Sequence, residues 1–436
     1  MMTQQNTQEE TFYSMLEKLY GDSTDGESLK RLKAKAWERF QEIGLPTRKT
    51  EVYKYVRLRS LFSRAFASSH PTRLDASAVE GYVYPECKTS FLVFINGHYR
   101  PELSDTSGLN SKIVITHLSA ASRTYGTFLN NRWSKELKAE TDPFAVLNGA
   151  LTRDGAFIYV PPGTVAGAPL QIIQLADAEE TTMAMIPRIH CFVGAGAEFA
   201  ILNDHRHRSG SGYCVNEVID MAVEEGAHVR CYQTAMEYPD DAWVFTALRA
   251  TLKRDSTLKA VSVTNGSVTV RDDYRVALMG ENAEADLNGA WMTGSRHEVH
   301  THVLVDHQQP HCRSNQLFKG VLRDTSRSSF EGKIYVHAEA QKTDAFQLNN
   351  NLILSEGAHA DSKPNLEIFA DDVKASHGST VGQLDEELLF YMKSRGVSDD
   401  TAKNLLIHGY CREVIDLISI PTLAKKLSDY AKSFLK

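Results

Sequence analysis

Short extended segments and almost no helical pattern occupy the chain between about residues 171 and 382. Small or polar turns introduce these segments, and the turns at 194–197, 225–227 and 255–257 lie roughly 30 residues apart, the spacing of a supersecondary repeat. One such repeat cannot bury its apolar face alone, whereas stacked repeats cover one another. The strands are short and their side chains alternate, which favours a right-handed parallel β-helix over a sandwich and makes the fold mostly β.

A closer spacing is visible toward the end of this region. Arg327, Asp344, Asp361 and Gly378 follow one another at intervals of 17 residues. We interpret them as aligned polar turn positions of successive rungs. The asparagines at 349–351 are expected at the corners of a rung.

Helical patterns flank the β region on both sides. Apolar residues recur at three- and four-residue steps between residues 11 and 66, where Gly44 ends one helix. Beyond the β region, 384–396 is a helix ended by glycine, Ser398 is a suitable N-cap for the next helix, and Pro421 begins the last one.

The pattern predicts three domains. Residues 1–150 form a helical and mixed N-terminal domain, 151–383 the β-helix core, and 384–436 a helical C-terminal domain. The two open ends of a β-helix must be covered, and the helical modules at the two termini are the expected caps.

Composition excludes several classes of protein. A net charge of -7 argues against a general nucleic-acid binder, which needs a basic surface. The polar, acidic N-terminus has no signal-peptide core, and no stretch approaches the roughly 20 apolar residues of a membrane span, so we expect a cytoplasmic protein. The six cysteines form no Cys-x-x-Cys pair, so each is interpreted as a small buried hydrophobe.

Nucleotide-binding and hydrolase signatures are absent from the sequence. The segment around Gly332-Lys333 lacks both the upstream glycine and the hydroxyl residue of a P-loop, so ATP binding of that type is excluded. Neither the dinucleotide-binding Gly-x-Gly-x-x-Gly nor the Gly-x-Ser-x-Gly of serine hydrolases occurs in a suitable context.

One histidine cluster supports an alternative function. On a strand, His300 and His302 share a face, and with His297 they could bind zinc or iron in a cytosolic metal-dependent hydrolase. We favour the competing interpretation, in which these histidines lie on the polar outer face of a β rung. The same two interpretations apply, with a weaker case for metal, to His205 and His207.

Two carboxylate pairs raise the possibility of glycoside hydrolysis, because many β-helices cleave polysaccharides. Asp272-Asp273 and Asp371-Asp372 are each adjacent in sequence, so the two carboxylates of a pair point to opposite faces of a strand. Glycoside hydrolysis requires two carboxyl groups that face one another. This chemistry is therefore not favoured.

His377 stands where the chain leaves the last rung for a helix. A neutral imidazole there could ligate iron or transfer a proton near physiological pH. Taken alone, it is better explained as a hydrogen-bonded turn histidine. A single ligand makes no site, so any metal function requires residues from another rung or another chain.

Three neighbouring segments carry a family resemblance. Residues 363–374 read KPNLEIFADDVK, 376–385 read SHGSTVGQLD, and 389–396 read LFYMKSRG. They strongly resemble the SufB/SufD family of iron–sulfur cluster assembly scaffolds, and within it the SufD members, because SufB members carry Glu-His-Glu-Ala where this chain has Ser-His-Gly-Ser. The likeness extends through 44–48, 154–163 and 194–204 and so covers nearly the whole chain.

The resemblance implies a non-catalytic scaffold that works in a SufBCD complex. In that family a β-helix core pairs with SufB through its edge, C-terminal helices dock the ATPase SufC, and SufC hydrolyses the ATP. It further implies no cofactor tightly bound by the isolated chain, with an iron–sulfur cluster or iron held transiently at the SufB–SufD interface. Whether the chain forms a homodimer alone is left open.

The resemblance also assigns site residues. His377 is implied at the SufB interface and in cluster or metal binding, with Lys374, Ser376 and Gly378 beside it. Many relatives carry cysteine where this chain has Ala375, so a thiolate from that position is absent. The residues implied in SufC docking are Phe390, Tyr391, Arg395, Gly396, His408, Gly409 and Cys411.

Overall fold

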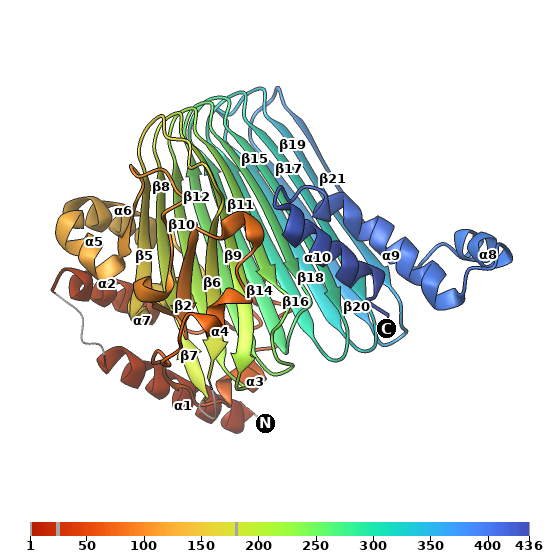
Figure 1. The fold of residues 1–436 in the computed structure, drawn as a ribbon, viewed down its shortest axis with the longest axis horizontal. Helices are drawn as coiled ribbons and strands as arrows, with labels where there is room; N and C mark the ends of the chain where they lie inside the picture. Colours follow the sequence, from red (N-terminus) through yellow and green to blue (C-terminus); the bar gives the residue numbers. More distant parts are fainter. Residues whose placement is uncertain (1, 23–26, 179–181, 436) are drawn as a thin grey trace.

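A parallel β-helix of two large sheets dominates the computed structural model, which describes residues 2–22, 27–178 and 182–435 (Figure 1). From β8 onward, successive strands alternate between the sheets. Sheet A has the order β20-β18-β16-β14-β12-β10-β8-β5-β4. In addition, β7 pairs with β10, and β1 pairs with β7. Sheet B has the order β21-β19-β17-β15-β13-β11-β9-β6-β2-β3. The predicted mostly β fold with a parallel β-helix is confirmed.

The elements have the following bounds. The helices are α1 Met2–Gly21, α2 Glu27–Ile43, α3 Arg59–Phe62, α4 Ser77–Glu80, α5 Leu118–Thr124, α6 Gly126–Ala139, α7 Pro143–Leu151, α8 Glu386–Ser394, α9 Asp399–Ile415 and α10 Pro421–Lys432, with 3-10 turns η1 Glu51–Tyr53, η2 Pro85–Cys87 and η3 Pro101–Leu103. The strands are β1 Ala67–Ser68, β2 Phe91–Ile95, β3 His98–Tyr99, β4 Val114–His117, β5 Asp154–Val160, β6 Leu170–Asp177, β7 Met183–Met185, β8 Pro187–Val193, β9 Glu198–Ser209, β10 Cys214–Val223, β11 His228–Ala235, β12 Trp243–Leu252, β13 Thr257–Thr264, β14 Thr269–Leu278, β15 Glu284–Thr293, β16 Glu298–His307, β17 Arg313–Leu322, β18 Arg327–Val336, β19 Asp344–Ile353, β20 His359–Ile368 and β21 Lys374–Gly382.

The strand register identifies the repeat of roughly 30 residues with one complete coil. In sheet B, Thr257 pairs with Glu284, Glu284 with Arg313, and Arg313 with Asp344. All of these pairs are parallel, so each coil places its side chains directly above those of the previous coil. The predicted spacing of the coils is confirmed.

The 17-residue spacing has a different meaning from the one predicted. Arg327 begins β18 in sheet A, whereas Asp344 begins β19 in sheet B. Asp361 is already inside β20 and Gly378 inside β21. The interval therefore measures the step from one sheet to the other, and the interpretation as aligned turns of stacked rungs was wrong.

Alternation of side chains builds the core of the coil. In β16, Val299, Val303 and Val305 point into a continuous apolar interior. The asparagines of 349–351 were wrongly placed at corners, because they lie in the middle of β19, where Asn349 and Asn351 are buried inside the coil. Asn351 Nδ2 donates to Asn349 Oδ1 at 2.9 Å, and this bond offsets the cost of burying two amides.

The N-terminal helices cover the outer face of sheet A. In one of the closest contacts, the ring of Phe144 on α7 stacks on Phe245 of β12 with centroids 3.8 Å apart. Pro143 begins α7, and the Asp142 carboxylate caps it by accepting hydrogen bonds from the backbone of Phe144 and Ala145.

A buried ionic network joins this helical module to the sheet. Arg271 of β14 lies 2.9 Å from Asp142 and 2.7 Å from Asp273, and its guanidinium lies 4.2 Å from the centre of the Tyr53 ring. Tyr53 in turn donates its hydroxyl hydrogen to Asp142 at 2.7 Å. The Arg271 side chain is 2% exposed, so the Asp142 carboxylate depends on it for charge compensation, whereas Asp273 also lies 2.7 Å from Arg249 and 3.3 Å from Arg275.

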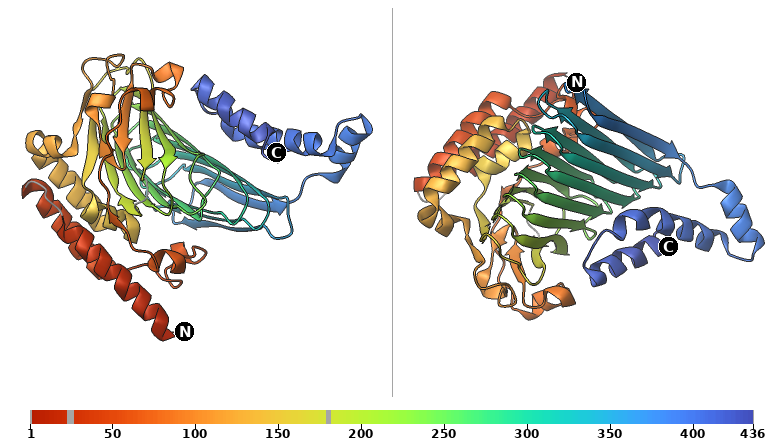
Figure 2. Two further views of the ribbon diagram at one scale, coloured as in Figure 1. Left: turned by 60° about the horizontal axis from the view of Figure 1, so that its bottom comes forward. Right: turned by 90° about the horizontal axis from the view of Figure 1, so that it is seen from above.

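The C-terminal helices cover the outer face of sheet B, and not the end of the coil. Ile407, Cys411 and Val414 of α9 pack in one apolar cluster with Val321 of β17. Figure 2 shows α9 and α10 lying along the side of the sheet while the edge strands remain uncovered. The expectation that this module caps the coil was wrong, because its apolar stripe is matched to the outer face of β15 and β17.

The helix α8 projects away from the body of the protein (Figures 1 and 2). Asp385 caps its first turn by accepting from the backbone of Glu387 and Leu388, and Gly396 follows it with a φ of 86°. Ser398 caps α9 and Pro421 begins α10, as predicted. Among the described residues no helix combines the length and the apolar character that crossing a membrane requires.

Candidate functional site at the open end of the β-helix

Two unpaired strand edges lie next to each other at the C-terminal end of the coil. The strand β21 pairs only with β19, and β20 pairs only with β18. The outer edge of each therefore presents backbone N–H and C=O groups with no strand beside them. We refer to these two edges together as the open end.

Exposed apolar side chains surround the open end. Phe369 is 59% and Val381 53% exposed, and Ile368, Phe346 and Leu348 are also exposed. Isolated exposed hydrophobic residues are ordinary, but a cluster beside two free strand edges is typical of a surface that another protein covers. Free strand edges of this kind have the geometry that β-strand addition requires.

His377 lies on β21 at the end of a ladder of polar side chains. It pairs in register with Gln347 of β19, which pairs with Gln316 of β17, so all three share the interior-facing side of sheet B. Gln347 and Gln316 are buried and joined by a hydrogen bond of 2.7 Å. His377 is exposed only because no further coil covers it. The structure therefore places an exposed imidazole on the inward-facing side of the last strand of sheet B.

The neighbours of His377 alternate as a strand requires. Ala375 faces inward and packs in a small cluster with Ala345 and Val336. Lys374 and Ser376 are exposed on the other face, and Gly378 lies against Leu348, which a Cβ at that glycine would meet at 3.1 Å. The four residues predicted at the partner surface are thus brought together on one edge strand.

The residues predicted to dock an ATPase divide into exposed and buried groups. Phe390 is 74% and Tyr391 58% exposed on α8, and the guanidinium of Arg395 lies 5.2 Å from the centre of the Tyr391 ring. Gly396 and Gly409 are also exposed, and a Cβ at Gly409 would meet no atom within 4 Å. These residues present an apolar and cationic surface on α8 and α9.

Two residues of that set are occupied within the chain. His408 is half-buried and bonds through Nε2 to Ser428 Oγ at 2.8 Å. Cys411, a residue of α9, is fully buried, and burial raises the pKa of its thiol to about 12. Its sulfur is therefore a protonated core atom that does not reach the surface. The other five cysteines are likewise buried.

The histidines proposed for a hydrolase do not converge on a metal site. His300 bonds to Ser329 at 2.7 Å, His302 to Asp273 at 3.0 Å, and His297 to Asp240 at 2.9 Å. His300 and His302 lie on the outer face of β16, as we favoured, but they are buried there against the N-terminal module. The hydrolase alternative thus has no support.

The remaining candidate histidines and carboxylates also have structural roles. His205 is buried and lies 3.0 Å from Glu217, while His207 is half-buried beside Tyr213. Asp272 and Asp273 point to opposite faces, as predicted, since Asp272 accepts from Thr246 and Asp273 from Arg271.

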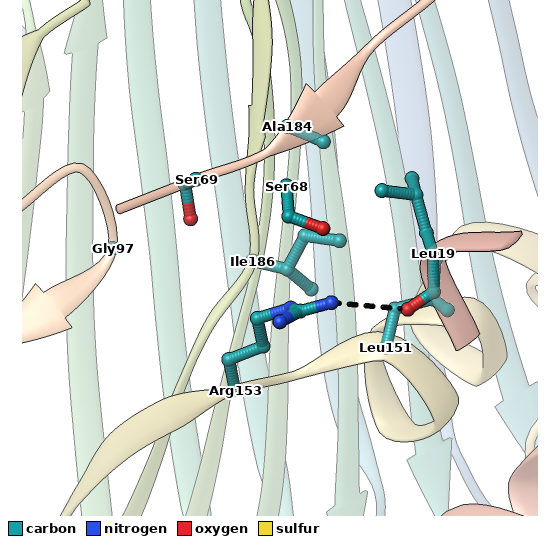
Figure 3. Close-up of a pocket in the computed structure, with 8 residues that line it drawn as sticks. All are labelled: Leu19, Ser68, Ser69, Gly97, Leu151, Arg153, Ala184 and Ile186. Carbon is teal, nitrogen blue, oxygen red and sulfur yellow. Dashed lines mark hydrogen bonds between the residues drawn. The ribbon is translucent and has the colours of Figure 1, made fainter. Parts of the chain in front are cut away.

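A small cavity near the N-terminus serves no ligand. Figure 3 shows its lining where the end of α1 meets β1 and β7, with Arg153 donating to the carbonyl of Leu19 at 3.2 Å. Its volume of about 10 Å³ accommodates one water molecule at most.

Comparisons with known proteins agree with this architecture. The family model described as "SUF system FeS cluster assembly, SufBD core domain" matches residues 174–410, and the "SufBD protein N-terminal region" matches residues 3–172. The chain belongs to the SufBD family. The core model begins within β6 and ends on α9, so it includes the open end and α8 of this SufBD chain.

Individual relatives cover most of the chain. The iron–sulfur cluster assembly protein SufD of Escherichia coli is 31% identical over 389 residues, which are 86% of each protein. A SufBD family protein of Synechocystis is 30% identical over 88% of this chain and 86% of its own length. SufB of Bacillus subtilis is 22% identical over 75% of this chain and 70% of its own.

Two structural features of this SufBD chain have no local signal in its sequence. The buried network around Arg271 and a cavity beneath α6 are built by segments far apart in the chain, so no local spacing marks them. Only the high density of arginines and acids in 132–140 and 271–275 could have pointed to them.

Proposed function

We propose that this chain is a non-catalytic scaffold for iron–sulfur cluster assembly, pairing with a SufB-type partner and docking a SufC-type ATPase. The open end is the observation that carries the proposal. There this member of a family of cluster-assembly proteins exposes two strand edges beside apolar side chains. The family includes both SufD and SufB relatives, which supports a partner of the same fold.

Strand addition accounts for the exposed groups at the open end. A partner strand beside β21 would satisfy its backbone groups, and a second beside β20 would complete the coil. The partner would bury Phe369 and Val381 and cover His377. Lys374 and Ser376 would lie at the rim of the interface, where charged and polar groups direct pairing more than they strengthen it.

His377 would contribute one ligand, or a proton acceptor, to a cluster assembled across the interface. The cluster is cargo that the complex builds and releases. Imidazole nitrogen suits iron, but one ligand cannot hold a cluster, so the remaining ligands would come from the partner. Ala375 supplies none, since its methyl group packs inward.

ATP hydrolysis would belong to the docked partner. The sequence has no P-loop, and the exposed α8 offers an apolar surface that projects beyond the coil. A helix held at this position can move with an ATPase without disturbing the sheets, since α8 packs mainly on α9 and none of its described residues is buried.

Coexpression tests the pairing. The tagged chain is expected to recover SufB-type and SufC-type proteins encoded in the same genome. Replacing both Phe369 and Val381 with aspartate should weaken recovery of the SufB-type protein by roughly 30-fold or more, because buried charges replace two apolar contacts. Val165→Asp, at an exposed valine far from the open end, is the matched control and should bind normally. Failure of the unmodified chain to recover either partner would refute the proposal.

Replacing His377 with alanine tests its role at the interface. The three-protein complex should form as before, because His377 adds no fold-stabilising hydrogen bond, while the cluster content of the complex should fall about tenfold or more. Iron and sulfide analysis of the anaerobically purified complex provides the measurement, and Ser379→Ala on the same strand is the control. An unchanged cluster content would reduce His377 to a structural residue.

A further inference from the structure

A cavity of about 390 Å³ lies between α6 and the outer face of sheet A, and its strand nearest the open end, β16, is separated from the edge strand β20 by β18. The strands β8, β10, β12, β14 and β16 form its floor, and Figure 1 shows α6 beside β8. Its volume falls in the range of small-molecule sites, and it opens to solvent. None of the residues placed at the partner or ATPase surfaces lines it.

The floor of the cavity is apolar. The apolar side chains that face it come from α6, α7, the strands β10, β14 and β16 and the residue after β14: Trp133, Ala145, Val218, Ala277, Met279 and Leu304. Such a surface accommodates the body of an organic molecule and gives no reason for the space to hold only water.

Basic groups outnumber acidic groups around this floor. Six are basic (Arg132, Lys135, Arg188, Arg249, Lys253 and Arg275) and four are acidic (Glu136, Glu140, Asp220 and Asp306). Two guanidinium groups hold Glu140, which lies 2.6 Å from Arg249 and 2.9 Å from Arg275, and its pKa is lowered to about 2. Lys135 and Lys253 have no carboxylate partner in the described part of the chain, so the excess charge is positive.

Several polar atoms in the wall of the cavity are buried and lack a partner among the described residues. Arg249 Nη2 is a donor of this kind, whereas Glu136 Oε2 and Asp220 Oδ1 are acceptors. Each of these atoms is covered by the atoms around it, so the groups that face the open space are the lysines and the apolar floor.

A divalent cation does not fit these groups. Glu136, His190 and Asp220 place potential ligand atoms within 4.8 Å of one another. However, Arg188 donates to Asp220 and, through Nε, to His190 Nε2 at 3.1 Å, and Arg132 lies 2.7 Å from Glu136. A cation here would lie among guanidinium groups that already compensate the two carboxylates.

We infer that this cavity is a binding site for a small organic anion with an apolar body and a carboxylate or phosphate group. The anionic group lies in the field of Lys135 and Lys253, and the body lies on the apolar floor.

Two fluorescent probes separate this site from a merely apolar hollow. The probe 8-anilinonaphthalene-1-sulfonate carries an aromatic body, an N–H donor and a sulfonate, and N-phenyl-1-naphthylamine is the same molecule without the charge. The full-length chain should bind one equivalent of the anilinonaphthalene sulfonate about tenfold or more tightly than the neutral probe, with energy transfer from Trp133. Equal affinity for both probes would overturn the inference.

Matched variants locate the probe. Ala277→Phe fills the cavity and should abolish binding, and Lys135→Glu should weaken it about tenfold. Lys138→Glu makes the same charge change on an exposed residue of α6 that does not line the cavity, and should leave binding within about twofold. Circular dichroism and the melting temperature verify that each variant is folded. Binding that survives Ala277→Phe in a folded protein would refute the site.

Competition then defines the anionic group. Displacement of the probe by benzoate indicates a carboxylate ligand, and displacement by phenyl phosphate a phosphate ligand, so either result supports an anion site. Stoichiometric binding of Zn²⁺ that is lost in His190→Gln, with no displacement by either anion, would overturn it in favour of a metal site. These outcomes do not depend on the SufB-type or SufC-type partners and are separable from the test of the scaffold role.

Discussion

Replacing Arg271 with methionine is expected to lower the free energy of unfolding by about 3–5 kcal/mol. The change leaves Asp142 and Asp273 buried without their shared guanidinium, and it removes the cation from the face of the Tyr53 ring. The loss should be larger than that of an ordinary core truncation of similar size, because uncompensated charge is more costly to bury than a cavity. Urea denaturation followed by circular dichroism measures it.

An exposed ion pair provides the control for this variant. Arg254 pairs with Glu225, and both side chains are more than half exposed, so Arg254→Met should leave the urea midpoint of unfolding almost unchanged. Adding Asp142→Asn to Arg271→Met should restore part of the stability by removing the uncompensated charge, whereas Asp273 keeps Arg249 and Arg275 as ion-pair partners. A loss below about 1 kcal/mol for Arg271→Met would mean that water reaches the network.

Replacing both Phe390 and Tyr391 with alanine is expected to weaken binding of the SufC-type ATPase by about 100-fold or more. Exposed aromatic side chains that become buried at an interface contribute about 2 kcal/mol each when they act as hot spots. The fold should not change, because α8 contributes nothing to the buried core of the coil. Surface plasmon resonance with the purified ATPase measures the affinity, and pairing with the SufB-type protein should be unaffected.

Three further variants sharpen this test. Phe128→Ala removes another half-exposed aromatic on α6 and should leave ATPase binding unchanged. Gly409→Trp should weaken binding by steric obstruction, since the space around Gly409 is empty and the fold tolerates a side chain there. Arg395→Glu reverses the charge beside Tyr391 and should weaken binding as well. Normal affinity of the double alanine variant would place the docking surface elsewhere.

The β-helix could be predicted because its determinants are local. Alternation of apolar residues and the polar turns recur in every coil, and the helix boundaries at Gly44, Ser398 and Pro421 follow from backbone and capping preferences. The position of the terminal helices could not be predicted in this way. An apolar stripe on a helix does not say which apolar surface it meets, and here α9 meets the side of sheet B.

The candidate site was only partly accessible from the sequence. Residue type and position suggested His377, but its proposed importance depends on the absence of a further coil, which only the three-dimensional structure reveals. Exposure separates Phe390 from Cys411, although the resemblance assigned both to SufC docking. Arg271 gave no signal because its partners Asp142 and Tyr53 lie 129 and 218 residues before it.

The long separation between Tyr53 and Arg271 has a consequence for synthesis of the chain on the ribosome. At about 5–20 residues per second, roughly 10–40 s pass between translation of the two residues. During that interval the strands of sheet A that the N-terminal helices cover emerge one after another, and apolar faces not yet covered are open to chaperones and to other nascent chains. The helical module is therefore translated first but cannot complete its contacts until β14 has emerged, and translation pauses before β14 would prolong its exposure.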